Sequence, residues 1–149
     1  MSVEQVVAFA SVAGVIVALA SVVVALRGVR DQLWLQTFSE YTRRYGEIVT
    51  DLPSEARRPG GTYLFDEQDE SEQGRVLNTA RAYLNLCSEE YYLHSRGRID
   101  DETWTIWRDG MIEVFRAPWI QTTWDILEPE YRFLEFCEFV DQCIADANR

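Results

Sequence analysis

The stretch Val6 to Leu26, VVAFASVAGVIVALASVVVAL, decides the architecture that we expect for this chain. It holds no charged residue, no Asn, no Gln and no Pro, and Arg27 follows it directly. An α-helix rises about 1.5 Å per residue, so this stretch would form a rod of about 30 Å, the thickness of a bilayer's hydrocarbon core. The sequence therefore predicts one N-terminal transmembrane helix within residues 1–28.

Positive charge follows the apolar stretch and does not precede it. Arg27 and Arg30 lie just after it, whereas the first five residues, MSVEQ, carry only Glu4 among charged side chains. By the positive-inside rule, the N-terminus lies outside and the C-terminal domain is cytoplasmic, which places the protein in a cell inner membrane as a single-pass chain. A cleaved signal peptide ending near Ala18-Leu19-Ala20 is the alternative, and the missing positive n-region and the long apolar run disfavour it.

One side of the predicted membrane helix carries only small side chains. At about 100° per residue they fall within an arc of about 80°. These residues, which we call the small-residue seam, are Ala10, Gly14, Ala18, Ser21, Ala25 and Gly28. Helices in membranes associate by close backbone approach, so the seam predicts self-association; the general abundance of Ala, Gly and Ser in the segment is the alternative. Any pore lined by this uncharged span would be hydrophobic.

Helical spacing of apolar residues continues along the rest of the chain. A stalk helix is expected over residues 29–52, as a direct continuation of the membrane helix, with Pro53 ending it. Residues 53–70 combine Pro, Gly and acidic residues and predict an irregular acidic loop. Residues 71–149 predict a cytoplasmic helical domain, a bundle of about four helices packed on the stalk. The expected fold class is all-α.

Composition limits the classes of function. The net charge is −11, from 25 acidic residues and 14 basic ones, and such a surface repels the phosphates of nucleic acid. We therefore expect no nucleic-acid partner. The three cysteines, Cys87, Cys137 and Cys143, are an odd number, which argues against a disulfide framework and favours reduced, buried thiols.

Candidate chemistry is sparse, and each candidate has a structural alternative. His94 follows Glu90 by four residues and could form an acid-base pair with it, but a histidine stabilised by the helix dipole and by Glu90 is favoured. The cysteines and His94 could meet at a zinc ion, but the chain has no CxxC motif. The acids from Asp66 to Glu72 could hold a divalent cation, but Asp69 with Glu72 is typical of a helix N-cap. We expect no catalytic residue, no metal and no cofactor, and a protein that is not an enzyme.

Tryptophan is abundant in the predicted helical domain. The four residues there are Trp104, Trp107, Trp119 and Trp124. Their spacing is that of core positions, and core is the first interpretation. So many rings in a small domain are also typical of an interface, so the four are candidate interface aromatics.

Three short motifs carry a resemblance to a family. They are NLCSEEYY at residues 85–92, GRIDDETW at residues 97–104, and Trp119. Together they resemble an uncharacterised family of small bacterial membrane proteins with one N-terminal membrane helix and a helical domain. The layout is more distantly similar to the membrane-bound accessory protein of RNA-targeting CRISPR systems, which forms a ring-shaped pore. The resemblance implies an oligomeric membrane assembly and brings no catalytic residue.

Two hypotheses of function follow. In the first, the chain is a single-pass membrane protein that homo-oligomerises through the small-residue seam and its helical domain. Its most specific form is a membrane-perturbing or gated pore in stress or phage defence. In the second, the membrane helix is only an anchor, and the acidic domain is an adaptor or regulator that binds a cytoplasmic protein partner.

Overall fold

The computed structural model describes the backbone of residues 3–58 and 63–149, and the side chains of residues 18–29, 32–58 and 63–149. In this part of the chain every regular element is a helix. The predicted all-α class is therefore confirmed. The chain divides into two compact units, which are described separately below.

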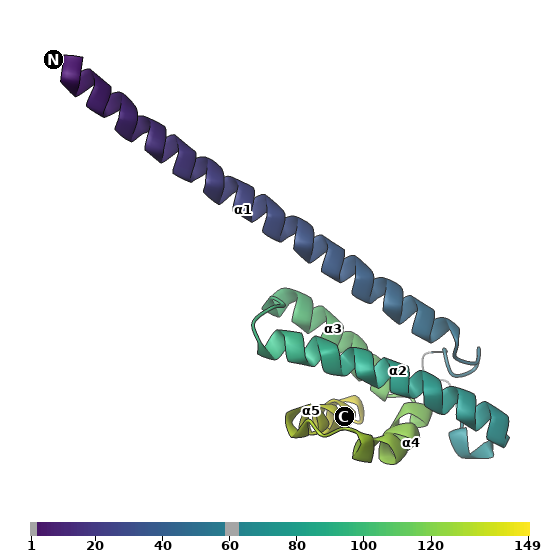
Figure 1. Ribbon diagram of the computed structural model, residues 1–149. Coiled ribbons are helices and arrows are strands. Elements are labelled where there is room, and N and C mark those ends of the chain that lie inside the picture. The colour runs from purple at the N-terminus through teal and green to yellow at the C-terminus, as the bar shows by residue number, and fades with distance from the viewer. Residues whose placement is uncertain (1–2, 59–62) are drawn as a thin grey trace. The chain divides into compact units, whose positions relative to one another are not determined.

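The first unit, residues 1–42, is formed by most of one long helix, α1, which runs from Val3 to Thr50 (Figure 1). The prediction that the apolar stretch and the stalk form one continuous helix is confirmed. After Thr50 the chain turns, with the Asp51 and Leu52 amides donating to the carbonyls of the last helical turn. Pro53 has no amide hydrogen and cannot extend the helix, so α1 ends where the sequence predicts.

A membrane span is not shown by the described side chains. No helix among them carries an apolar stretch long enough to cross a membrane. Residues 6–17 of the predicted span lie outside the described side chains, and with them Ala10 and Gly14 of the small-residue seam. The transmembrane helix therefore stays a prediction.

The second unit, residues 43–149, combines the end of α1 with the other helices. These are η1 (Phe65–Glu67), α2 (Glu70–Ser95), α3 (Asp101–Phe115), α4 (Pro118–Leu127), η2 (Glu128–Glu130) and α5 (Leu134–Ala147), where η marks a 3-10 helix. Helix α2 packs against α3 and α4, and α3 packs against α4 and α5 (Figure 1). The described chain thus contains four α-helices after α1, as expected.

The core of this unit gathers side chains from all of its α-helices. Its fully buried members include Leu84 of α2, Phe115 of α3, Ile120 of α4 and Phe136 of α5. Ile48 of α1 packs against the same core. Apolar stripes spaced by three and four residues meet here, which is why the helices form where the sequence pattern places them.

Of the segment predicted as an irregular acidic loop, residues 53–70, the structure describes residues 53–58 and 63–70. Phe65 and Tyr63 are buried in the core, and the chain forms η1 around Phe65. The side-chain amide nitrogen Nε2 of Gln73 in α2 donates to the Phe65 carbonyl, which joins this turn to the next helix. Burial of these two aromatic side chains holds the described residues around Phe65 against the core.

Side-chain caps fix the starts of α2 and α3. Asp69 Oδ1 accepts from the Glu72 amide at 2.9 Å, so the predicted N-cap is confirmed. Asp100 accepts from both the amide and the hydroxyl of Thr103, at 2.9 and 2.8 Å. Each cap satisfies an amide that has no partner within its helix.

Replacing Asp100 by Ala should destabilise the second unit. The change removes both bonds to Thr103, and an N-cap of this kind contributes about 1 kcal/mol. The free energy of unfolding in urea, followed by circular dichroism of the full chain in mild detergent, measures the loss. Asp101→Ala is the matched control, because the neighbouring Asp101 is not the cap. Equal effects of the two substitutions would contradict this role of Asp100.

Candidate functional site

Large apolar side chains are exposed along the described part of α1. Eight of them are at least 47 % exposed to solvent. They are Leu19, Val22, Val23, Val24, Leu26, Val29, Leu33 and Leu35. Four members of the small-residue seam, Ala18, Ser21, Ala25 and Gly28, are also exposed. Nothing lies within 4 Å of the place where a Cβ on Gly28 would stand. This length of helix is an apolar surface available to lipid or to another helix.

Two of the candidate interface aromatics are core residues. Trp119 is 3 % exposed and Trp124 is 2 % exposed. The indole nitrogen of Trp124 donates to Asp141 Oδ1 of α5 at 3.1 Å. For these two residues the core interpretation is confirmed, and they have little surface to offer a partner.

The other two, Trp104 and Trp107, are half-buried against the edge of the core. Trp104 stacks on His94 with ring centroids 4.5 Å apart and an angle of 5° between the planes. It also meets Tyr91 at 6.1 Å and Phe139 at 5.4 Å, so α2, α3 and α5 are joined here by aromatic rings. A role of Trp104 and Trp107 in an interface stays a prediction.

The acid-base pair considered for Glu90 and His94 is not formed. His94 Nδ1 is buried and has no hydrogen-bond partner within the described residues, Glu90 included. The His94 ring instead stacks on the ring of Trp104. The expected stabilisation of His94 by Glu90 is therefore replaced by an aromatic contact.

Glu90 is a buried carboxyl group on α2. Its side chain is 7 % exposed. Burial raises its pKa from 4.5 to about 8, with Arg44 lowering the pKa and Glu89 raising it further. The group is therefore largely neutral at pH 7, which is unusual for a glutamate.

The end of α1 meets α2 through a few long side chains. The Arg44 guanidinium donates to both carboxylate oxygens of Glu89, at 2.6 and 3.1 Å. Tyr45 lies against Tyr83 with ring centroids 6.2 Å apart. We call this contact between residues 43–52 and α2 the α1–α2 seam.

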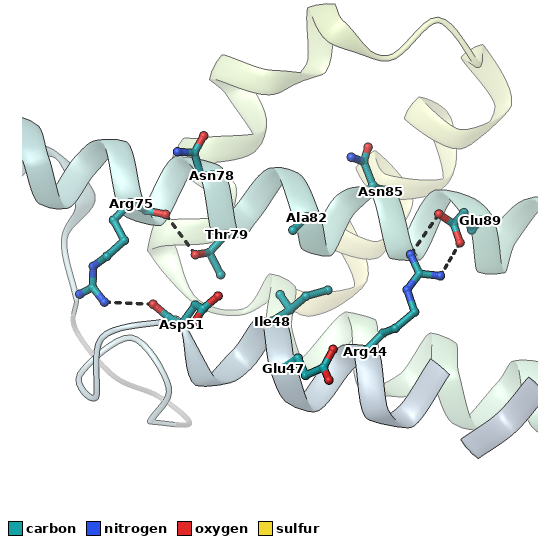
Figure 2. Close-up of a pocket in the computed structure, with 10 residues that line it drawn as sticks. All are labelled: Arg44, Glu47, Ile48, Asp51, Arg75, Asn78, Thr79, Ala82, Asn85 and Glu89. Atoms are coloured by element: carbon teal, nitrogen blue, oxygen red, sulfur yellow. Dashed lines mark hydrogen bonds and ion pairs between the residues drawn. The ribbon is translucent and has the colours of Figure 1, made fainter. Parts of the chain in front are cut away.

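A groove lies along the α1–α2 seam, with a volume of about 640 Å³ (Figure 2). The ion pair of Arg44 and Glu89 closes one end, and Arg75, which donates to the Asp51 carbonyl at 3.1 Å, lies at the other. The lining residues are Arg44, Glu47, Ile48, Asp51, Arg75, Asn78, Thr79, Ala82, Asn85 and Glu89. Charged and amide side chains line the groove together with Ile48 and Ala82, so it offers both polar and apolar surface to a polypeptide.

The three cysteines are buried and unpaired, as predicted. Burial raises the pKa of the Cys143 thiol to about 12 and raises the pKa of Cys87 and Cys137 as well. Among the residues whose side chains are described, no three His, Cys, Asp or Glu residues could hold a metal ion together.

These thiols should react slowly with an alkylating reagent in the native protein. Each unit by which a pKa rises lowers the thiolate fraction about tenfold, and burial blocks access as well. At pH 7.5 we expect modification about 100-fold or more slower than in urea, followed by mass spectrometry. A cysteine introduced as Asn148→Cys at the exposed C-terminus is the control. Native thiols that react as fast as this cysteine would contradict the burial.

Comparison with models of protein families, with curated proteins and with solved structures found no match. The resemblance drawn from the three short motifs therefore stays a prediction.

Sequence reasoning missed the burial of Glu90. Positions 76, 80, 83, 87 and 90 follow one another at steps of four and three residues, and the side chains at all five are buried. The signal was present in this spacing, since Glu90 continues a stripe that Val76 and Cys87 define. A carboxyl group on an apolar stripe either has a raised pKa or is paired with a cation or a hydrogen-bond donor. The sequence alone does not say which of the two holds.

Proposed function

We propose that this chain is a single-pass inner-membrane protein, with its N-terminus outside and its helical domain in the cytoplasm, that assembles with copies of itself. The observation that carries the proposal is the continuity of α1. One helix, Val3–Thr50, contains the whole uncharged stretch Val6 to Leu26 and continues into the domain. A helix is the form in which a lipid-exposed segment satisfies its own backbone hydrogen bonds.

The exposed side chains of α1 give the physical reason for anchoring. Removing a Val or Leu side chain from water contributes roughly 1.5–3 kcal/mol. The eight exposed Leu and Val residues between Leu19 and Leu35 therefore favour a surrounding of lipid or of other helices. Lipid tails are no more apolar than Leu, so association inside the membrane relies on small residues such as Gly14 and Ala18.

The most specific form of the proposal is a membrane-perturbing or gated pore in stress or phage defence. It rests on the resemblance described above and on the lack of ionisable residues between Val6 and Leu26. A pore of this kind would open by wetting of a hydrophobic constriction. We assign no catalytic residue and no cofactor to it.

A second candidate is an adaptor or regulator that binds a cytoplasmic protein partner. The groove along the α1–α2 seam favours it, because a groove of about 640 Å³ lined by charged, amide and apolar side chains is a surface for protein contact. In this case α1 would serve only as an anchor. The net charge of −11 disfavours nucleic acid as the partner in either case.

Replacing Gly14 by Leu should separate the two candidates. If the seam brings helices together, a Leu side chain keeps their backbones apart and the assembly dissociates. The mass of the full chain in mild detergent, measured by light scattering, should fall from that of an oligomer to that of a monomer. Val12→Leu, on the opposite side of the same helix, is the control and should leave the mass unchanged. A monomeric wild-type protein would exclude the assembly and leave the adaptor.

Single cysteines at the two ends of the chain test the topology. In a variant with Cys87, Cys137 and Cys143 replaced by Ala, we expect Ser2→Cys to react with a membrane-impermeant reagent in intact cells. Asn148→Cys should react only after the cells are opened. Labelling at position 148 in intact cells would overturn the orientation. Recovery of the chain in the soluble fraction would overturn the membrane anchoring itself.

A further inference from the structure

One side of α2 carries a symmetric pattern of exposed side chains. At about 100° per residue they fall within an arc of about 80° on the helix. All of them line the groove and are exposed. These residues, which we call the outer face of α2, are Arg75, Asn78, Ala82, Asn85 and Glu89.

Ala82 lies at the centre of the outer face. Arg75 precedes Ala82 by seven residues and Glu89 follows it by seven. Between the centre and these ends stand two asparagines, Asn78 four residues before Ala82 and Asn85 three residues after it. If a second copy of this helix is laid antiparallel on the first, asparagine therefore meets asparagine and arginine meets glutamate. A surface with this property is complementary to itself across a two-fold axis.

The charges of the outer face favour a second copy as its partner. The whole chain carries a net charge of −11, so two copies repel one another over most of their surface. The outer face holds one arginine and one glutamate and is neutral. The Arg75 side chain is 52 % exposed and the Glu89 side chain is 49 % exposed. Each keeps its ion pair within the copy, with Glu72 and Arg44 respectively, and has surface left for a second one.

The two asparagines are held in place by their own copy. Arg81 donates to Asn78 Oδ1 at 2.8 Å, and the Tyr131 hydroxyl donates to Asn85 Oδ1 at 3.0 Å. No hydrogen bond from either Nδ2 group occurs within the described residues. Both side chains point to the same side of α2, one on each side of Ala82 (Figure 2). An amide oxygen accepts two hydrogen bonds, so each asparagine can both donate to an asparagine of another copy and accept from it.

The centre of the outer face allows close approach of a helix. Ala82 has a single methyl group as its side chain, and the distance between two packed helices depends on the side chains at their contact. Ile48 of α1 lies in the same groove and adds apolar surface next to Ala82. A helix placed along the groove would therefore meet an apolar centre between polar ends, which is the usual order in a protein interface.

We propose that the outer face of α2 joins the helical domains of two copies, with two α2 helices packed antiparallel across a two-fold axis at Ala82. Arg75 of each copy then lies opposite the partner's Glu89, and Asn78 lies opposite the partner's Asn85. The occupant of the groove is the α2 helix of a second copy. This inference rests on the self-assembly proposed above, and it gives that assembly a second contact outside the predicted membrane helix.

A cysteine at the centre of the outer face tests the pair. Ala82→Cys places a thiol on the proposed axis, where it meets its own counterpart within reach of a disulfide. With the full chain in mild detergent and copper phenanthroline as oxidant, a non-reducing gel should show a covalent dimer. The wild type is the first control, because its three thiols are buried.

Gly74→Cys is the matched control for Ala82→Cys. Gly74 is exposed on α2, and nothing lies within 4 Å of the place where its Cβ would stand. In the antiparallel pair, the two copies of residue 74 are about 24 Å apart along the helices, so this variant should cross-link at least about tenfold more slowly. Equal rates for the two variants would refute the pair.

The mass of the same sample separates this inference from the proposed assembly. An oligomer by light scattering that does not cross-link at position 82 refutes the α2 pair and leaves self-assembly through the membrane helix. A monomeric wild type refutes the assembly, and the pair with it.

Exchange of the two charges gives an independent test. Arg75→Glu places a carboxylate opposite the partner's Glu89, and Glu89→Arg places a guanidinium opposite the partner's Arg75. In the Ala82→Cys background, we expect either change alone to slow cross-linking at least about tenfold, because like charges are brought together. Co-expression of the two variants, one with a larger tag, restores opposite charges at both ends of a mixed pair, which should cross-link at the original rate.

The mixed sample also controls for damage inside a single copy. Each substitution disturbs the ion pairs of its own chain to the same extent alone and in the mixture. Recovery in the mixed pair therefore reports the contact between copies. A mixed pair that cross-links no faster than the separate variants would contradict the antiparallel arrangement.

Discussion

Burial of one face of α2 is the constraint on which the second unit depends. Val76, Leu84 and Cys87 are fully enclosed, and α3, α4 and the end of α1 pack around this helix. A helix of this length exposes more apolar surface than it can keep in water, so its neighbours are positioned by the stripe that they cover. The caps at Asp69 and Asp100 set where the chain enters these helices.

The same face carries polar groups at a cost in stability. Glu90 is buried and its pKa is raised by that burial, and His94 Nδ1 is buried without a hydrogen bond within the described residues. Most buried polar groups in folded proteins are satisfied, so such exceptions call for a reason beyond packing. For His94 the stack on Trp104 is part of that reason.

Helix α1 obeys a different constraint. Hydrogen bonds within a helix are local, so Val3–Thr50 can form without contacts from the rest of the chain. Its exposed Leu and Val side chains are still unfavourable in water. For this reason we propose that lipid or other helices surround α1.

The sequence by itself determined the features that depend on neighbours along the chain. Apolar spacing predicted the helices, Pro53 the end of α1, and Asp69 the start of α2, because propensity, capping and periodicity act over a few residues. Only the tertiary structure decided which tryptophans are core and that burial raises the pKa of Glu90. These outcomes depend on which helix faces meet, through pairs as distant as Arg44 and Glu89, and no local pattern specifies them.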